Sequence, residues 1–151
     1  MARVPYEQRS VLLALQSYLG TKGWNNVTYT DGYQGESTIT NPQVTVTFPP
    51  STITELQLGR GSDKLYNRRV LVNAYMESEK RAQAIADDIM DFMDETCVDI
   101  VDPDGDTLGY LLCSNSENIR AETFPPILNN PKLIRYRAAV QGPFDAFYPG
   151  A

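Results

Sequence analysis

The clearest pattern of hydrophobic and polar positions lies between Leu65 and Glu95. Over Tyr66–Met76, β-branched and aromatic residues alternate in part with polar ones, which predicts a strand. From Glu79 onward the hydrophobic residues recur at steps of three and four, which predicts an amphipathic helix. We therefore expect a strand, a short hinge and one long helix in this part of the chain.

The two sides of each predicted element differ in chemistry. One face of the strand would carry Tyr66, Arg68, Val70, Val72, Ala74 and Met76, and the other Asn67, Arg69, Leu71, Asn73 and Tyr75. The apolar stripe of the helix would comprise Ala82, Ile85, Ala86, Ile89, Phe92 and Met93. Its other side carries Asp87, Asp88, Asp91, Asp94 and Glu95. The apolar stripe is expected to face the core and the acidic side to remain at the surface.

A first helix is predicted from Pro5 to Leu19. Pro5 suits the first helical position, and Glu7 follows in the first turn, where a negative charge is favourable. Gly20 suits the left-handed conformation that often follows a helix end. The apolar stripe of this helix would comprise Val11, Leu12, Leu15, Tyr18 and Leu19.

Several short strands are predicted from the remaining hydrophobic runs. They fall at residues 27–30, 43–48, 52–58, 97–101, 107–113, 119–124 and 134–140. The glycine-rich segment 59–64 would be the tip of a hairpin that leads into the long strand. Residues 20–42 read as a long loop, and the aromatic segment 141–151 as a C-terminal piece with little core of its own.

The order of these elements is helix, strands, long helix, strands. Short turns between successive strands favour antiparallel pairing. We therefore predict a single α+β domain over residues 1–151, with a mainly antiparallel sheet and two helices packed on one of its faces.

Composition narrows the function. The net charge of −6 argues against a protein whose main task is to grip a phosphate backbone. No apolar run approaches the ~20 residues of a membrane span, and no signal peptide precedes the first helix. We expect the chain to fold in the cytoplasm with Cys97 and Cys113 as free, buried thiols.

The chain has no histidine. This excludes nucleophile–histidine pairs and histidine-ligated zinc, and it removes the side chain that titrates near neutral pH. Two cysteines alone do not complete a four-ligand zinc site. We therefore expect no enzyme activity, no cofactor and no resident metal.

Two loops resemble ligand-binding motifs only in part. Asp102, Asp104 and Asp106 have the spacing of a calcium loop, but the sequence around them is that of a tight hairpin turn. Weak, adventitious cation binding is the remaining alternative there. The Gly-Arg-Gly at 59–61 lacks the helix that a phosphate-binding loop needs, so we interpret it as a hairpin tip. Its Arg60, with Asp63 and Lys64, could contact a protein partner.

Arginines occur on two predicted strands. Arg68 and Arg69 point to opposite faces, and Arg135 and Arg137 lie on the last strand. Contacts between arginine and carboxylate groups, within or between subunits, fit this pattern better than nucleic-acid binding.

The acidic side of the long helix leaves two interpretations open. Asp87 and Asp91 lie four residues apart, as do Asp91 and Glu95, and each such pair of like charges weakens a helix by roughly 0.2–0.5 kcal/mol. The side is either a solvated surface or one selected for its charge, to meet a basic partner or to repel a polyanion. General acid–base catalysis is disfavoured because a solvent-facing helix side is not a desolvated cleft.

The arrangement resembles the tail terminator (tail completion) proteins of long-tailed bacteriophages. The strongest local similarity is Leu71–Met93, LVNAYMESEKRAQAIADDIMDFM, and the overall layout covers most of the chain. The resemblance implies a structural virion protein that forms a ring, typically of six copies. Such a ring caps the finished tail tube, stops its polymerisation and offers its other face to the head connector.

The resemblance also suggests roles for surface residues. Ring contacts with other subunits or partners would involve Arg60, Asp63, Lys64, Arg68, Arg69, Phe144, Phe147 and Tyr148. Asp87, Asp91 and Asp94 would face the channel or its rim, so that DNA passes without binding. The expected partners are further copies of this chain, the tail tube protein and the head connector or neck proteins. The alternatives are another neck, connector or minor tail component, a small carboxylate- or metal-dependent hydrolase, and a DNA-packaging accessory factor.

Overall fold

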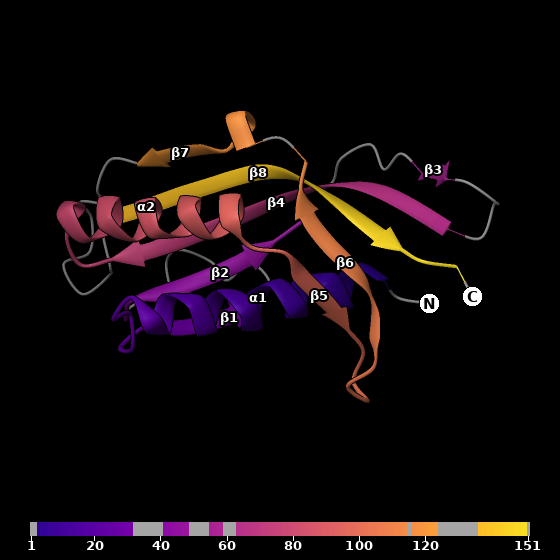
Figure 1. Cartoon of the computed structure of the whole chain (residues 1–151). Coiled ribbons are helices and arrows are strands. Elements are labelled where there is room, and N and C mark those ends of the chain that lie inside the picture. The colour runs from indigo at the N-terminus through magenta and orange to yellow at the C-terminus, as the bar shows by residue number, and fades with distance from the viewer. Residues whose placement is uncertain are drawn as a thin grey trace.

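A computed structural model of the chain describes residues 3–31, 41–48, 55–58, 63–114, 116–123 and 136–150. Two helices and eight strands, with one short 3-10 turn, make up this part of the chain (Figure 1). The helices are α1 (Arg3–Thr21) and α2 (Glu79–Glu95), and the 3-10 turn is η2 (Ser116–Asn118). The strands are β1 (Thr28–Asp31), β2 (Gln43–Thr47), β3 (Glu55–Leu58), β4 (Asp63–Met76), β5 (Val98–Val101), β6 (Thr107–Cys113), β7 (Arg120–Thr123) and β8 (Tyr136–Tyr148).

The sheet is built around the long antiparallel pair β4 and β8. They stay in register from Lys64 opposite Tyr148 to Met76 opposite Tyr136. The strand order is β1-β2-β4-β8-β6-β5, with β3 on β4 and β7 on β8. On its edge away from β8, β4 pairs with β3 near its start and with β2 near its end. On its edge away from β4, β8 pairs with β7 near its start and with β6 near its end. All strand pairs are antiparallel except β1 with β2, so the predicted α+β class is confirmed.

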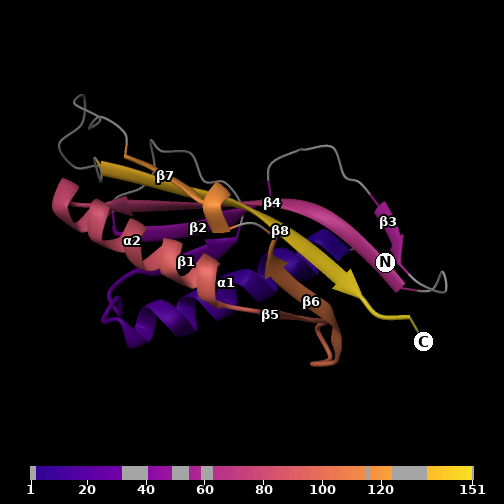
Figure 2. The ribbon, with the colours of Figure 1, turned by 45° about the horizontal axis from the view of Figure 1, so that its top comes forward.

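Both helices lie on one face of the sheet, as Figures 1 and 2 show. The predicted inner face of β4 is buried throughout, from Tyr66 to Met76 in alternate positions. The buried residues of α2 are the predicted stripe: Ala82, Ile85, Ala86, Ile89, Phe92 and Met93. At the far end the sheet curls over α1, where the backbone N–H of Val101 donates to Ser10 Oγ at 3.0 Å. These contacts form one continuous core.

The boundaries of α2 follow from local chemistry. Ser78 caps its start, because the Ser78 hydroxyl oxygen accepts from the backbone N–H of Arg81 at 3.2 Å. The helix ends at Glu95, since Thr96 has an extended backbone while its N–H still bonds the carbonyl of Phe92. The hinge between β4 and α2 is therefore only two residues long.

The predicted end of the first helix is wrong. Gly20 lies inside α1, which continues to Thr21, and the left-handed residue is Gly23, with φ of 94°. The N–H of Trp24 reaches back to the carbonyl of Leu19 at 3.0 Å, which closes the helix end. Glu7 also differs from expectation, because it lies beyond the first turn and is fully buried.

The second correction concerns the C-terminal segment. Residues 141–148 continue β8 rather than forming a separate aromatic piece. Phe144 and Tyr148 belong to the core, whereas Phe147 points to the other side of the sheet. Both predicted hairpins are present, β3–β4 and β5–β6. The two cysteines are free, but Cys97 is exposed and Cys113 half-buried, so the expectation of two buried thiols is wrong.

Candidate interaction surfaces

A buried charged cluster ties the two ends of the chain to β4. Glu7 of α1, fully buried, accepts hydrogen bonds from Arg68 Nε at 2.5 Å and from Arg68 Nη2 at 3.1 Å. The hydroxyl of Tyr148, at the end of β8, donates to the second carboxylate oxygen. The Arg68 guanidinium also lies 4.9 Å from the centre of the Tyr66 ring. The second terminal nitrogen of Arg68, Nη1, is buried without a hydrogen-bond partner.

The structure places some of the residues expected at a subunit interface in the core and others at the surface. Arg68, Phe144 and Tyr148 are buried inside the chain, so their side chains face its core rather than its surface. Arg69 and Phe147 lie on the sheet face opposite the helices, which we call the outer face.

The hairpin residues expected at an interface lie at the start of β4. Asp63 Oδ1 accepts from the backbone N–H of Gly150, which holds the last described residues against this strand. Lys64 is half-buried, and Arg60 lies outside the described residues.

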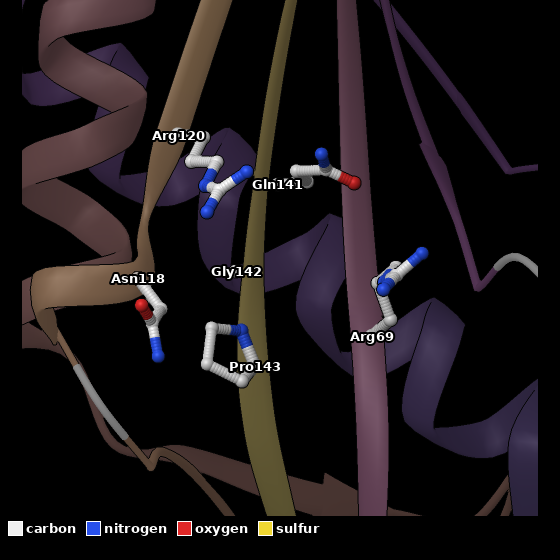
Figure 3. Close-up of a pocket in the computed structure, with 6 residues that line it drawn as sticks. All are labelled: Arg69, Asn118, Arg120, Gln141, Gly142 and Pro143. Carbon is white, nitrogen blue, oxygen red and sulfur yellow. The ribbon is translucent and has the colours of Figure 1, made fainter. Parts of the chain in front are cut away.

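A groove runs across the outer face. Figure 3 shows its lining side chains, which come from β4, β8, β7 and η2: Arg69, Asn118, Arg120, Gln141, Gly142 and Pro143. Its volume is about 340 Å³. A second hollow of about 180 Å³ adjoins it and shares Arg120 and Gln141. Within the described part of the chain, Arg69 and Arg120 form no hydrogen bond or ion pair, and both are exposed.

Apolar side chains follow the groove along the same face. Tyr110 lies directly opposite Phe147 in the β6–β8 pair, and Leu112 is two residues further along β6. Tyr110 is 41% exposed and Leu112 50% exposed. Tyr110 and Leu112 alternate in the sequence with Gly109, Leu111 and Cys113, but nothing there indicates which side of the sheet the helices cover.

The outer face also holds a carboxyl with a shifted pKa. Burial raises the pKa of Asp145, which lies opposite Leu112 on one side and Asn67 on the other. Toward β2, the outer side chains Thr45, Asn73 and Tyr75 are buried.

The acidic side of α2 is at the surface. Asp87, Asp91 and Asp94 are exposed and, within the described residues, make no hydrogen bond or ion pair. We call these three the acidic stripe. Asp88 differs, because its carboxylate accepts from the indole N–H of Trp24 at 2.7 Å and so contributes to structure. A shallow hollow lies between Asp91 and Asp94 on one side and Glu117 on the other.

The aspartates of the β5–β6 turn serve the turn itself. Asp102 Oδ1 accepts from the backbone N–H groups of Asp104 and Asp106, both at 2.9 Å, and Gly105 takes a positive φ of 91°. Among the described residues, no cluster of three or more histidine, cysteine, aspartate or glutamate side chains is placed to hold a metal ion. None of the described helices is long and apolar enough to cross a membrane.

Comparisons with known proteins give distant similarities of fold. No family model matches the chain, and no curated protein matches its sequence. One solved chain without a functional name is 12% identical, covers 95% of this chain and 96% of its own, and superposes with a TM-score of 0.48. A chain of the virion of a native gene transfer agent particle is 15% identical, with coverage of 99% and 98% and a TM-score of 0.49.

Proposed function

We propose that this chain is a structural virion protein of a phage-like particle, and more specifically a tail terminator. In this role it forms a ring on the finished tail tube, stops tube polymerisation and presents a surface to the head connector. The resemblance of Leu71–Met93 to tail terminator proteins and the surfaces of the molecule support this role.

The observation that carries the proposal is the outer face of the sheet. It displays exposed apolar side chains, Tyr110 and Leu112, beside the exposed guanidinium groups of Arg69 and Arg120. A contiguous surface of this kind is typical of a protein–protein contact, in which aromatic and arginine side chains are enriched. The fold thus offers surface for assembly in addition to its own core.

The segment that carries the resemblance also forms the element pair that it implies. Leu71–Met93 spans the second half of β4, the two-residue hinge and most of α2. The buried face of this unit holds the sheet and the helix layer together. Its exposed side carries the acidic stripe, which is available to a partner.

The chemistry at the surface favours a structural role over a hydrolase. The three carboxylates of the acidic stripe lie along one exposed helix side rather than in a desolvated cleft. In the β5–β6 turn, the Asp102 carboxylate accepts from two backbone N–H groups and holds the turn closed.

Polymerising tail tube protein provides the test. Purified protein is added to growing tubes, and tube length and end structure are followed by electron microscopy. We expect tubes that stop growing, with added density at one end. Tubes that grow to the same length with and without the protein would overturn the terminator assignment. Density on connector particles instead of tubes would support another neck component.

A further inference from the structure

We propose that the groove on the outer face binds the acidic stripe of α2 from a neighbouring copy of this chain. The inference rests on the proposed ring and names the two surfaces that would form it. It assigns Arg69 and Arg120 to one side of the contact and Asp87, Asp91 and Asp94 to the other.

The groove and the acidic stripe carry opposite charges. The groove presents two exposed guanidinium groups without a partner in the described part of the chain, and the stripe presents three exposed carboxylates in the same condition. The groove lies on one face of the sheet, whereas α2 packs on the other. Among the described residues of one copy, no ion pair joins the two sets. Between copies, their fields attract and orient the encounter.

The charged groups of the two surfaces also have similar spacings. Asp87 and Asp94 are seven residues apart on a helix, which places their Cα atoms about 10 Å apart. Arg69 and Arg120 lie on the two strands that flank β8, opposite Pro143 and Gln141. They are therefore separated by two strand spacings across the sheet and by two residues along it. With ordinary strand spacing, that is about 12 Å. A helix laid across the groove can therefore bring both ends of the stripe near a guanidinium group.

The geometry predicts the kind of assembly. The two surfaces lie on opposite faces of the sheet, so one neighbour does not cover both. The contact is therefore heterologous, and each copy has one surface of each kind left to bind the next. Such a contact closes into a ring when the rotation per copy divides a full turn, and otherwise forms a filament. The apolar side chains of Tyr110 and Leu112, on the same face as the groove, would add buried area beside the charges.

This position of the acidic stripe differs from the channel position expected from the sequence. A stripe that lines a water-filled channel repels DNA and leaves the contact between copies unchanged when its charge is altered. A stripe that binds the groove controls assembly. Charge reversal distinguishes these two positions.

The experiment uses two variants of the full chain, Arg69→Glu/Arg120→Glu and Asp87→Lys/Asp91→Lys. Sedimentation and native mass spectrometry at low and high salt measure association of each variant alone and of an equimolar mixture. Asp104→Lys/Asp106→Lys, in the exposed β5–β6 turn, is the matched control. Circular dichroism checks that each variant is folded.

We expect each reversed variant alone to associate at least about tenfold more weakly than wild type, as for close interfacial charge pairs. The mixture should associate again with the two variants in equal numbers, because every junction then joins opposite charges. High salt should weaken wild-type association, and the control should behave as wild type.

Three results would overturn the inference. They are a wild type that stays monomeric at low salt, reversed variants that associate like wild type, and a mixture that fails to recover. Retention of duplex DNA by wild type, lost in the arginine variant, would assign the groove to nucleic acid instead. Tube capping is scored separately. Recovery of association without capping would refute the terminator role and leave this contact intact.

Discussion

Removing the charge of Glu7 should destabilise the folded chain more than any surface charge change. In Glu7→Gln the Arg68 guanidinium stays buried but loses its counter-charge, and the Tyr148 hydroxyl loses a charged acceptor. Breaking one side of a buried ion pair costs about 3–5 kcal/mol, because the remaining charge is left uncompensated. For a chain of this size that corresponds to a fall in Tm of about 6–20 °C.

Single and double variants separate the contributions of Glu7, Arg68 and Tyr148 to the unfolding free energy. Tyr148→Phe removes one hydrogen bond to a charged group and should cost about 1.5–3 kcal/mol. The double variant Glu7→Leu/Arg68→Met replaces the pair with apolar side chains and should cost less than the sum of its two single substitutions. The stability therefore depends on the pair being complete, not on the presence of charge as such.

Urea unfolding provides the measurement. Far-UV circular dichroism follows the helices, and the fluorescence of Trp24, the single tryptophan, follows the contact between the end of α1 and α2. Coincident transitions would justify a two-state free energy. Glu77→Gln is the matched control, because the Glu77–Arg81 pair is exposed by 42% and 47% and should contribute at most about 0.5 kcal/mol. A loss below about 1 kcal/mol in Glu7→Gln would refute the reasoning.

Three smaller perturbations have defined outcomes. Gly109→Ala should lower the unfolding free energy by about 1–3 kcal/mol, because an added Cβ would collide with the Phe147 carbonyl oxygen; an unchanged urea midpoint would contradict this close approach. Asp145→Asn should raise Tm at neutral pH, since burial raises the pKa of this carboxyl above its ordinary 3.8 and its ionisation opposes folding. That difference should vanish below pH 3.8, where the carboxyl is protonated in both states, and a gain that persists there would point to another cause. Partial burial, and then the charge of Asp99, raise the pKa of the Cys97 thiol. Alkylation of Cys97 at neutral pH should therefore be slower than that of a free peptide thiol, and it should be faster in Asp99→Asn than in wild type. Equal rates in wild type and Asp99→Asn would exclude the charge effect.

The parts of the fold that were predictable are those with local periodicity. The alternation of β4 and the three-to-four spacing in α2 each fix a buried face within a few residues, and both faces were predicted correctly. The pairing of β4 with β8 was not predictable in the same way, because it joins segments some sixty to eighty residues apart. The groove could not be predicted for the same reason, since the β4–β8 pairing places Arg69 beside β8 and the β7–β8 pairing places Arg120 beside Gln141.

Pro143 explains why the length of β8 was missed. Proline usually indicates that a strand is at an edge or has ended, yet here it lies in a central strand. Its carbonyl accepts from the N–H of Ser114, just after β6, so the nitrogen of Pro143 faces that same edge of β8. At that point β6 pairing is ending and β7 pairing begins two residues away, at Gln141. The pairing with β4 on the other edge therefore loses no hydrogen bond.

The neighbours Arg68 and Arg69 show how one strand serves both the fold and the proposed assembly. Strand alternation sends Arg68 into the core, where it pairs with Glu7, and Arg69 to the outer face, where it lines the groove. Charge removal at Arg68 should therefore lower the unfolding free energy of a single copy. The same change at Arg69 should leave the stability of a single copy within about 0.5 kcal/mol of wild type and weaken association instead. If Arg69→Gln destabilised the monomer as much as Arg68→Gln, the side chain would belong to the fold, and the outer face would have no free positive charge at that position for a neighbouring copy.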